Sequence, residues 1–160
     1  MINFKSHSGI YTLESSQEIP IPLDQAWDFF SSPKNLQAIT PPKMGFIITS
    51  DIAARTYAGQ IISYTVSILP GIRANWVTEI TTVKEQDYFV DEQRYGPYSM
   101  WHHEHFFEAT PEGNTIIRDK ISYKIPLGFI GRIMNGLFIE SQLKDIFNYR
   151  TEKLKEVFQS

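Results

Sequence analysis

Hydrophobic and polar residues alternate in short runs through most of the chain, which is typical of strands that bury one face. The predicted strands cover residues 10–19, 46–50, 59–69, 72–84, 88–94, 100–109 and 115–124. The gaps between the later strands are short and rich in turn-forming residues, such as Pro111–Glu112–Gly113–Asn114. These strands are therefore predicted to form an antiparallel, meandering sheet.

Helical patterns flank this strand-rich region. Two short helices are predicted after the first strand, one beginning near Asp24 and ending before Pro33, and one from Pro33 to Ile39. From Ile130 to Phe158 apolar residues recur every three or four positions, which predicts a C-terminal helix of roughly 40 Å. A helix of that length must lie across the sheet.

The order of these elements predicts an α+β fold in which residues 1–160 form one domain without internal repeats. We expect a seven-stranded, curved antiparallel sheet, with two short helices after the first strand, that wraps around the long C-terminal helix. A curved sheet and a straight helix do not close against each other everywhere. An elongated cavity lined by inward-facing side chains is therefore predicted between them.

Composition narrows the possible functions. The net charge of −3 gives no electrostatic basis for binding nucleic acid, and the absence of cysteine removes disulfides, thiolate metal ligands and cysteine nucleophiles. No signal peptide, membrane span, phosphate-binding loop or hydrolase Ser motif is recognisable, so we expect a cytoplasmic protein without a cofactor. Aromatic residues make up 14% of the chain, and rings beside polar groups often line cavities.

The strand at 100–109 carries the clearest chemical signal, because His103 and His105 fall on the same face. If the next turn is symmetric, His105 lies opposite Asp119, and the two side chains can hydrogen-bond. Asp91 or Glu92 of the preceding strand joins this face, but a shift of one residue exchanges them. Arg150 is expected to be solvated or paired with a carboxylate.

The same region carries a resemblance to a known family. The matching residues are Phe89-Val90-Asp91-Glu92-Gln93, Gly96-Pro97-Tyr98, Trp101, His103, His105, Phe107, Asp119, Tyr123, Pro126, Gly128, Gly131 and Ile146-Phe147-x-Tyr149-Arg150. With them the chain resembles the START/Bet v 1-like superfamily, also called SRPBCC, and within it the "ligand-binding SRPBCC domain" proteins. The resemblance implies a helix-grip fold. It also implies the binding of lipids, sterols or other hydrophobic molecules, since superfamily members bind these. Some members, which are similar to polyketide cyclases and aromatases, catalyse reactions in the same cavity.

We therefore predict that the protein binds a small, mainly hydrophobic ligand with a polar end, and that a homodimer is possible. The predicted ligand-binding residues are Tyr64, Trp76, Asp91, Trp101, His103, His105, Phe107, Asp119, Tyr123, Phe129 and Met134. For Tyr64, Trp76, Trp101 and Phe107, packing in the core is an equally good interpretation.

Three alternatives remain open at this stage. In a cyclase-like or aromatase-like enzyme, His105 and Asp119 would be the acid/base pair. In a metal protein, His103 and His105 would bind the ion with Asp119 as a third ligand. In a lipid carrier, residues 129–133 would form an edge that docks on a membrane surface without stable insertion.

Overall fold

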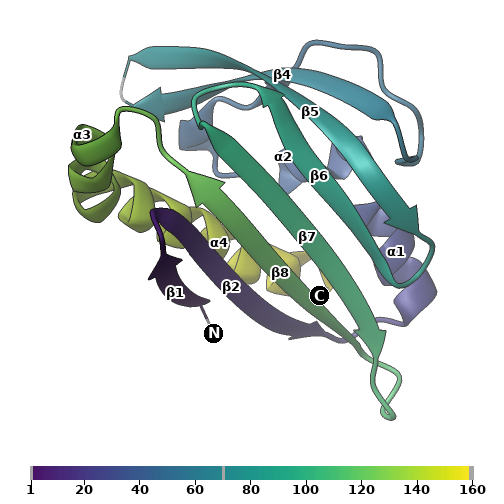
Figure 1. Cartoon of the computed structure of the whole chain (residues 1–160). Coiled ribbons are helices and arrows are strands. Elements are labelled where there is room, and N and C mark those ends of the chain that lie inside the picture. The colour runs from purple at the N-terminus through teal and green to yellow at the C-terminus, as the bar shows by residue number, and fades with distance from the viewer. Residues whose placement is uncertain (1, 70, 159–160) are drawn as a thin grey trace.

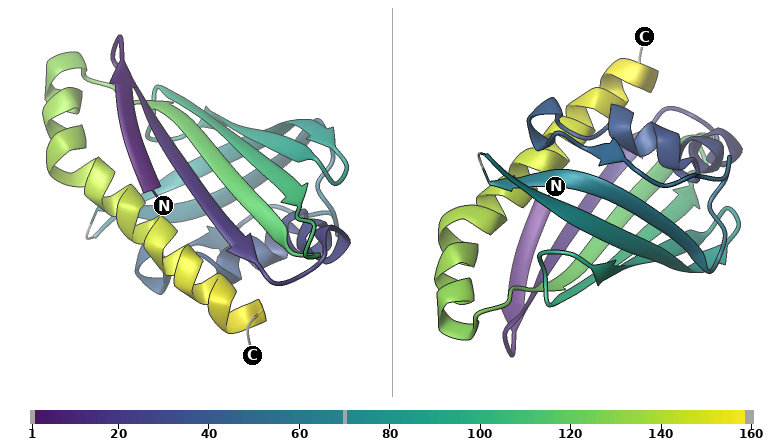
Figure 2. Two further views of the ribbon diagram at one scale, coloured as in Figure 1. Left: turned by 90° about the horizontal axis from the view of Figure 1, so that it is seen from below. Right: turned by 90° about the horizontal axis from the view of Figure 1, so that it is seen from above.

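The computed structural model describes residues 2–69 and 71–158, so residues 1, 70, 159 and 160 of the predicted domain lie outside the described part. One antiparallel sheet curves around a long C-terminal helix, as Figures 1 and 2 show. Its strands are β1 (Ile2–His7), β2 (Ile10–Ile19), β3 (Ile47–Ile48), β4 (Gln60–Leu69), β5 (Ile72–Lys84), β6 (Tyr88–Tyr95), β7 (Met100–Ala109) and β8 (Thr115–Lys124). The helices are α1 (Leu23–Phe30), α2 (Pro33–Ala38), a 3₁₀ turn (Pro42–Met44), α3 (Gly128–Met134), a π-helical segment (Asn135–Ile139) and α4 (Glu140–Phe158).

The sheet has eight strands in the order β1-β2-β8-β7-β6-β5-β4-β3, one more than predicted. The additional strand is β1, which pairs with β2 through a two-residue turn at Ser8 and Gly9. Both turn residues have positive φ, 52° and 78°, as tight hairpins require. Because most of this edge strand is exposed, it lacks the strong alternation that identified the others.

The predicted register of the β7–β8 hairpin is confirmed, with His105 opposite Asp119. The register of β6 against β7 settles the choice between the two acidic residues of β6. Asp91 lies opposite His103 and shares its inner face, whereas Glu92 lies opposite the outward-facing His102. The inner face therefore carries two histidines between two aspartates.

The C-terminal helical region contains an irregularity that the apolar periodicity did not predict. A π-helical segment joins α3 to α4, and its first residue, Asn135, is buried and accepts a hydrogen bond of 2.9 Å from Tyr123. Gly131 in α3 is required by close packing, since a Cβ there would lie 2.1 Å from the carbonyl oxygen of Pro126. Gly136 has open space around it, so packing does not explain its presence.

Two apolar clusters hold the helix against the sheet. Around one end of α4, Leu154 packs with a cluster that includes Trp27 and Phe107, whose rings meet edge to face at 5.4 Å. Around the other end, Leu143 and Phe147 pack with residues of β2 and β8. The inner face of β7 lies between these two clusters.

Candidate functional site

Five ionisable side chains meet on the inner face of the sheet below α4. Asp91 comes from β6, His103 and His105 from β7, Asp119 from β8 and Arg150 from α4. Each of these side chains is at most 16% exposed. They meet because alternate residues of a strand share a face, and because the register places an aspartate on either side of the histidine pair.

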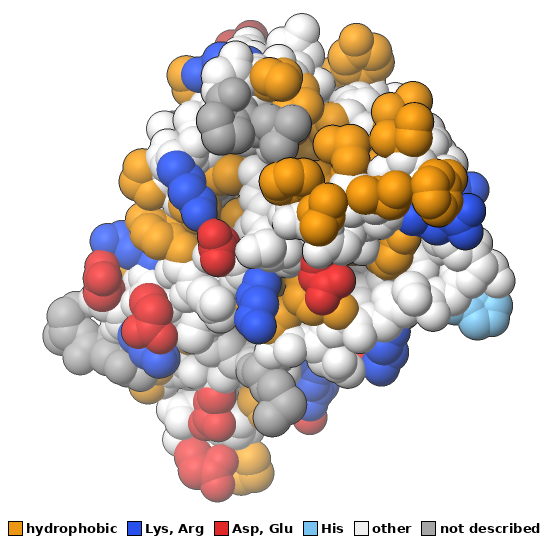
Figure 3. Space-filling view, turned by 90° about the vertical axis from the view of Figure 1, so that its left-hand side faces the viewer, with side chains coloured by type: hydrophobic (Ala, Val, Ile, Leu, Met, Phe, Trp, Pro, Cys, Tyr) orange, Lys and Arg blue, Asp and Glu red, His pale blue; other side chains and the backbone are white. Residues whose placement is uncertain are grey.

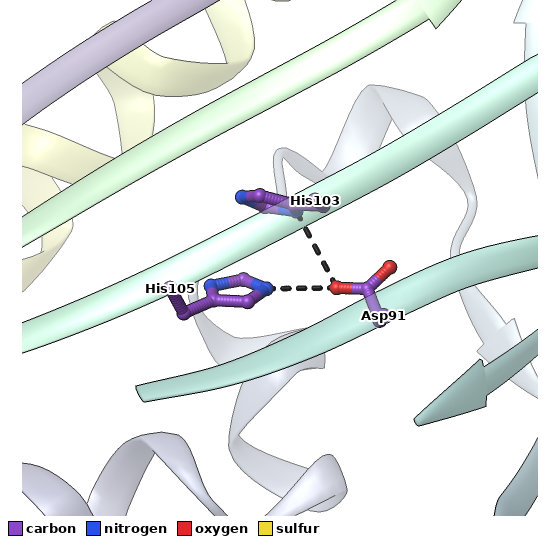
Figure 4. A group of neighbouring side chains, drawn as sticks. All are labelled: Asp91, His103 and His105. Carbon is purple, nitrogen blue, oxygen red and sulfur yellow. Dashed lines mark hydrogen bonds and ion pairs between the residues drawn. The ribbon is translucent and has the colours of Figure 1, made fainter. Parts of the chain in front are cut away.

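The hydrogen bonds of this cluster run diagonally between strands. His105 Nε2 lies 2.7 Å from Asp91 Oδ2, and His103 Nε2 lies 3.1 Å from Asp119 Oδ1. Arg150 Nη1 donates to the same Asp119 oxygen at 3.1 Å. His103 Nδ1 lies 3.5 Å from Asp91 Oδ2, so both imidazoles face the Asp91 carboxylate (Figure 4). Each imidazole also has its other ring nitrogen close to Asp119 Oδ1.

Because the hydrogen bonds run diagonally, the predicted hydrogen bond between His105 and Asp119 is not formed, although the two residues lie opposite each other. The two residues are opposite each other and His105 Nδ1 lies 3.0 Å from Asp119 Oδ1. The approach is not in hydrogen-bond geometry, however, so His105 Nδ1 is buried without a hydrogen-bond partner among the described residues. Side chains on a sheet reach diagonal neighbours as well as direct ones, which is why register alone did not predict the bonding partner.

Burial and charge shift the pKa values of the cluster in opposite directions. Burial favours the neutral acid at Asp119, but the Arg150 charge and the contacts with both histidines outweigh it and hold the pKa of Asp119 well below its usual range. The pKa of Asp91 is also lowered, since the hydrogen bond from His105 and the charges of both histidines outweigh burial.

The two histidines differ from each other. Burial and the neighbouring charge of His105 lower the pKa of His103. Burial acts the same way on His105, but its contacts with Asp119 and Asp91 outweigh burial and raise its pKa.

A cavity of about 450 Å³ opens beside this cluster, between the sheet and the helix. Its walls are mainly apolar, with Ile62, Val66 and Trp76 on the sheet side and Leu143, Ile146 and Phe147 on the helix side. Asp91, His103, His105 and Arg150 also line it and form one polar wall, which we call the charged wall. The cavity thus combines an apolar interior with a localised set of charged groups.

Seven of the eleven predicted ligand-binding residues line this cavity. They are Tyr64, Trp76, Asp91, Trp101, His103, His105 and Met134. The other four, Phe107, Asp119, Tyr123 and Phe129, do not line it. Phe107 packs in the apolar core, the alternative stated for it above, and Tyr123 is fully buried against Asn135.

Asp119 and Phe129 lie outside the cavity for different reasons. Asp119 is buried behind the histidines and contacts the site only through them and Arg150. Phe129 is 68% exposed on α3. Arg150 was expected to be either solvated or paired with a carboxylate. In the structure it pairs with a carboxylate, and it also lines the cavity.

Phe129 belongs to an exposed apolar patch. It consists of Leu127, Phe129, Ile130, Ile133, Leu137 and Phe138, each at least 47% exposed, and hydrophobic side chains gather across this face in Figure 3. Leu127 also lines the cavity, so the patch continues into the cavity wall. No helix within the described chain is long and apolar enough to cross a membrane.

Three side chains of the charged wall have the composition of a metal site. One ligand atom each from Asp91, His103 and His105 lie within 4.8 Å of one another. The carboxylate in this group is Asp91 rather than Asp119, the third ligand suggested by the sequence, and it lines the cavity where Asp119 does not.

A curved antiparallel sheet that grips a long helix over an apolar cavity defines the helix-grip class of proteins. No family model matches the chain, and no curated protein matches it in sequence. Solved structures do match it. A START superfamily protein from Mycobacterium smegmatis is 10% identical, over 91% of this chain and 98% of that one, with a TM-score of 0.68.

Two further structures extend the comparison. Norcoclaurine synthase from Thalictrum flavum, a point mutant in complex with a transition-state analogue, is 14% identical over 95% of this chain and 98% of that one, with a TM-score of 0.65. Ara h 8.0201 is 12% identical over 92% of this chain and 99% of that one, with a TM-score of 0.60. The chain therefore has the START/Bet v 1-like, or SRPBCC, fold.

Proposed function

We propose that the protein binds a small, mainly hydrophobic molecule whose polar end lies against the charged wall of the cavity. The observation that carries this proposal is the location of the buried charges. Four of the five buried ionisable side chains line one wall of an apolar cavity, and the fifth, Asp119, lies behind them.

The dimensions and chemistry of the cavity support a ligand of this kind. Pockets for small organic molecules measure about 300–1,000 Å³ and combine apolar walls with a few placed polar groups. Apolar burial supplies affinity at roughly 25 cal/mol per Å² of surface, and it does not orient the ligand. Asp91, His103 and Arg150 supply the orientation, because buried polar groups favour a partner that hydrogen-bonds to them.

The structural comparisons support the same proposal at the level of the fold. Norcoclaurine synthase, which shares the fold at low identity, was solved with a transition-state analogue bound. A fold that binds a small molecule in one protein is compatible with binding of a different molecule here, with its own lining residues.

Native mass spectrometry beside a denatured spectrum tests the proposal first. We expect a copurified adduct of a few hundred daltons, or saturable binding of the fluorescent apolar probe 1-anilinonaphthalene-8-sulfonate. Ile62→Trp projects a larger side chain into the cavity from β4 and should weaken probe binding. The neighbouring Ile61→Trp, at a position 49% exposed, should leave it unchanged. Equal binding by both variants would place the probe elsewhere and contradict the proposal.

An enzyme of the cyclase or aromatase type is the second candidate, favoured by His105 at the cavity wall with a carboxylate on either side. In this proposal His105 acts as the acid/base group toward a bound carbonyl compound, and Asp119 positions its ring. Turnover of a candidate polyketide by the wild type, and at least tenfold less turnover by His105→Gln, is the expected result. Equal turnover by the two proteins contradicts the role of His105.

A further inference from the structure

One nitrogen of His103 and one of His105 point toward the same oxygen of Asp91 on the charged wall, as Figure 4 shows, and the three ligand atoms lie within 4.8 Å of one another. Asp91 Oδ2 lies 2.7 Å from His105 Nε2 and 3.5 Å from His103 Nδ1. Two ligand atoms that each lie about 2.1 Å from one metal ion are roughly 3.0–3.4 Å apart at tetrahedral or octahedral angles. The two distances bracket this range. Side-chain movements that separate Asp91 from His105 and adjust the spacing of the two imidazole nitrogens would place all three atoms around one ion.

The remaining nitrogen of each histidine faces a second carboxylate. His103 Nε2 hydrogen-bonds to Asp119 Oδ1 at 3.1 Å, whereas His105 Nδ1 lies 3.0 Å from the same oxygen outside hydrogen-bond geometry. Histidines that bind a metal commonly direct the other ring nitrogen to a carboxylate, which fixes the ring orientation and the tautomer. Arg150 in turn holds Asp119 at 3.1 Å. The cluster thus has an inner set of three ligands and an outer carboxylate behind both histidines.

The charges of the cluster also suit a cation at this point. Asp91 and Asp119 contribute two negative charges in a buried setting, whereas Arg150 contributes one positive charge on the Asp119 side. The position between Asp91 and the two histidines therefore favours a cation, either a proton on an imidazole or a metal ion that displaces it. A divalent ion there would have carboxylate and imidazole ligands, which are the ligand types preferred by zinc and by ferrous iron.

We propose that Asp91, His103 and His105 form a binding site for a divalent transition-metal ion, with Zn²⁺ as the representative ion. All three residues line the cavity. The ion would therefore keep open coordination positions that face the cavity, which is the arrangement of sites that bind a further molecule rather than of purely structural sites. Metal binding by these three residues does not depend on whether the cavity also binds a hydrophobic ligand.

Titration of the untagged, chelator-treated protein with Zn²⁺ by calorimetry, and with Co²⁺ by visible absorption, tests this site. We expect one equivalent of metal per chain. His103→Ala, His105→Ala and Asp91→Asn should each weaken binding at least about 100-fold, since each removes one of three ligands. His102→Ala is the matched control, because His102 belongs to the same strand but faces outward and pairs with Glu92 at 2.8 Å. It should bind metal as the wild type does.

If the ligand variants do not fold, NMR of the protein with its three proposed ligands intact still tests the site. The chain has four histidines, His7, His102, His103 and His105, and NMR resolves their rings. His7→Gln and His102→Gln identify the two outer rings, so the remaining signals belong to the site. Addition of Zn²⁺ should shift those two ring signals and leave His7 and His102 in place.

Three results would overturn the site: no saturable binding of Zn²⁺ or Co²⁺ by the wild type, loss of binding in His102→Ala, or ring shifts at His7 or His102 alone. The test of hydrophobic-ligand binding is independent of the test of metal binding. Ile62→Trp should bind the apolar probe more weakly and keep the metal, and failure of probe binding in the wild type leaves the metal titration unaffected.

Discussion

Removal of the Arg150 charge is the most direct test of the charged wall. Arg150→Met keeps an unbranched apolar stem between Phe30 and Phe147, whose ring centroids lie 5.2 and 5.6 Å from the guanidinium carbon. The substitution removes the 3.1 Å contact with Asp119, a side chain that is only 6% exposed. The main effect is therefore a buried carboxylate that has lost its cation.

The magnitude follows from the burial of this pair. Loss of one partner of a buried ion pair costs about 3–5 kcal/mol of unfolding free energy, because the remaining charge is uncompensated. The contacts of Asp119 with His103 and His105 remain, which favours the lower end of that range. We expect Arg150→Met to lower the free energy of unfolding by about 3 kcal/mol, a large share of the roughly 5–15 kcal/mol typical of a domain.

Urea unfolding at pH 7, followed by circular dichroism and tryptophan fluorescence, measures this change. Asp119→Asn combined with Arg150→Met removes both charges, so the double variant should lose less stability than the sum of the single losses, by roughly 0.5–3 kcal/mol. Arg118→Met is the control, since Arg118 pairs with Glu108 at the surface with both side chains at least half exposed. It should cost less than about 1 kcal/mol. Equal losses for Arg150→Met and Arg118→Met, or strict additivity in the double variant, would refute the reasoning.

The remaining predictions concern the helical region that borders the cavity. Gly131→Ala should lower the melting temperature and perturb α3, because the new Cβ would lie 2.1 Å from the Pro126 carbonyl oxygen. Gly136→Ala meets open space and should raise the free energy of unfolding by up to about 1 kcal/mol; a loss there would contradict it. Tyr123→Phe leaves the buried Asn135 oxygen without its 2.9 Å donor and should cost about 1–3 kcal/mol in urea unfolding, and no change would show that water replaces the hydroxyl.

The fold was largely predictable because strong local signals marked most of its elements. The turn at residues 110–114 set the β7–β8 register, and this placed His105 opposite Asp119 as predicted. β1 was missed because only Ile2 and Phe4 alternate toward the interior, although the Ser8–Gly9 pair is a hairpin signal. A mostly exposed edge strand carries little periodicity to detect.

The candidate site was predictable in composition but not in connectivity. The His-x-His pattern identified the face, whereas the choice between Asp91 and Glu92 depended on a register that the sequence left open. The role of Arg150 had a usable signal, since it falls between Phe147 and Leu154 on the buried stripe of α4. A charge at a buried helix position requires a partner, and here the partner is Asp119.

The place of the charged wall beside the cavity gives a physical reason why these charged residues are present. A buried ion network is often no more stabilising than apolar residues of the same volume, so stability alone gives little reason for five ionisable groups between two apolar clusters. Four of the five line the cavity, and the fifth, Asp119, contacts both histidines and Arg150. Asp119 therefore orients groups that face the cavity, and an arrangement that fixes side chains toward an open space is expected where those side chains contact something held there.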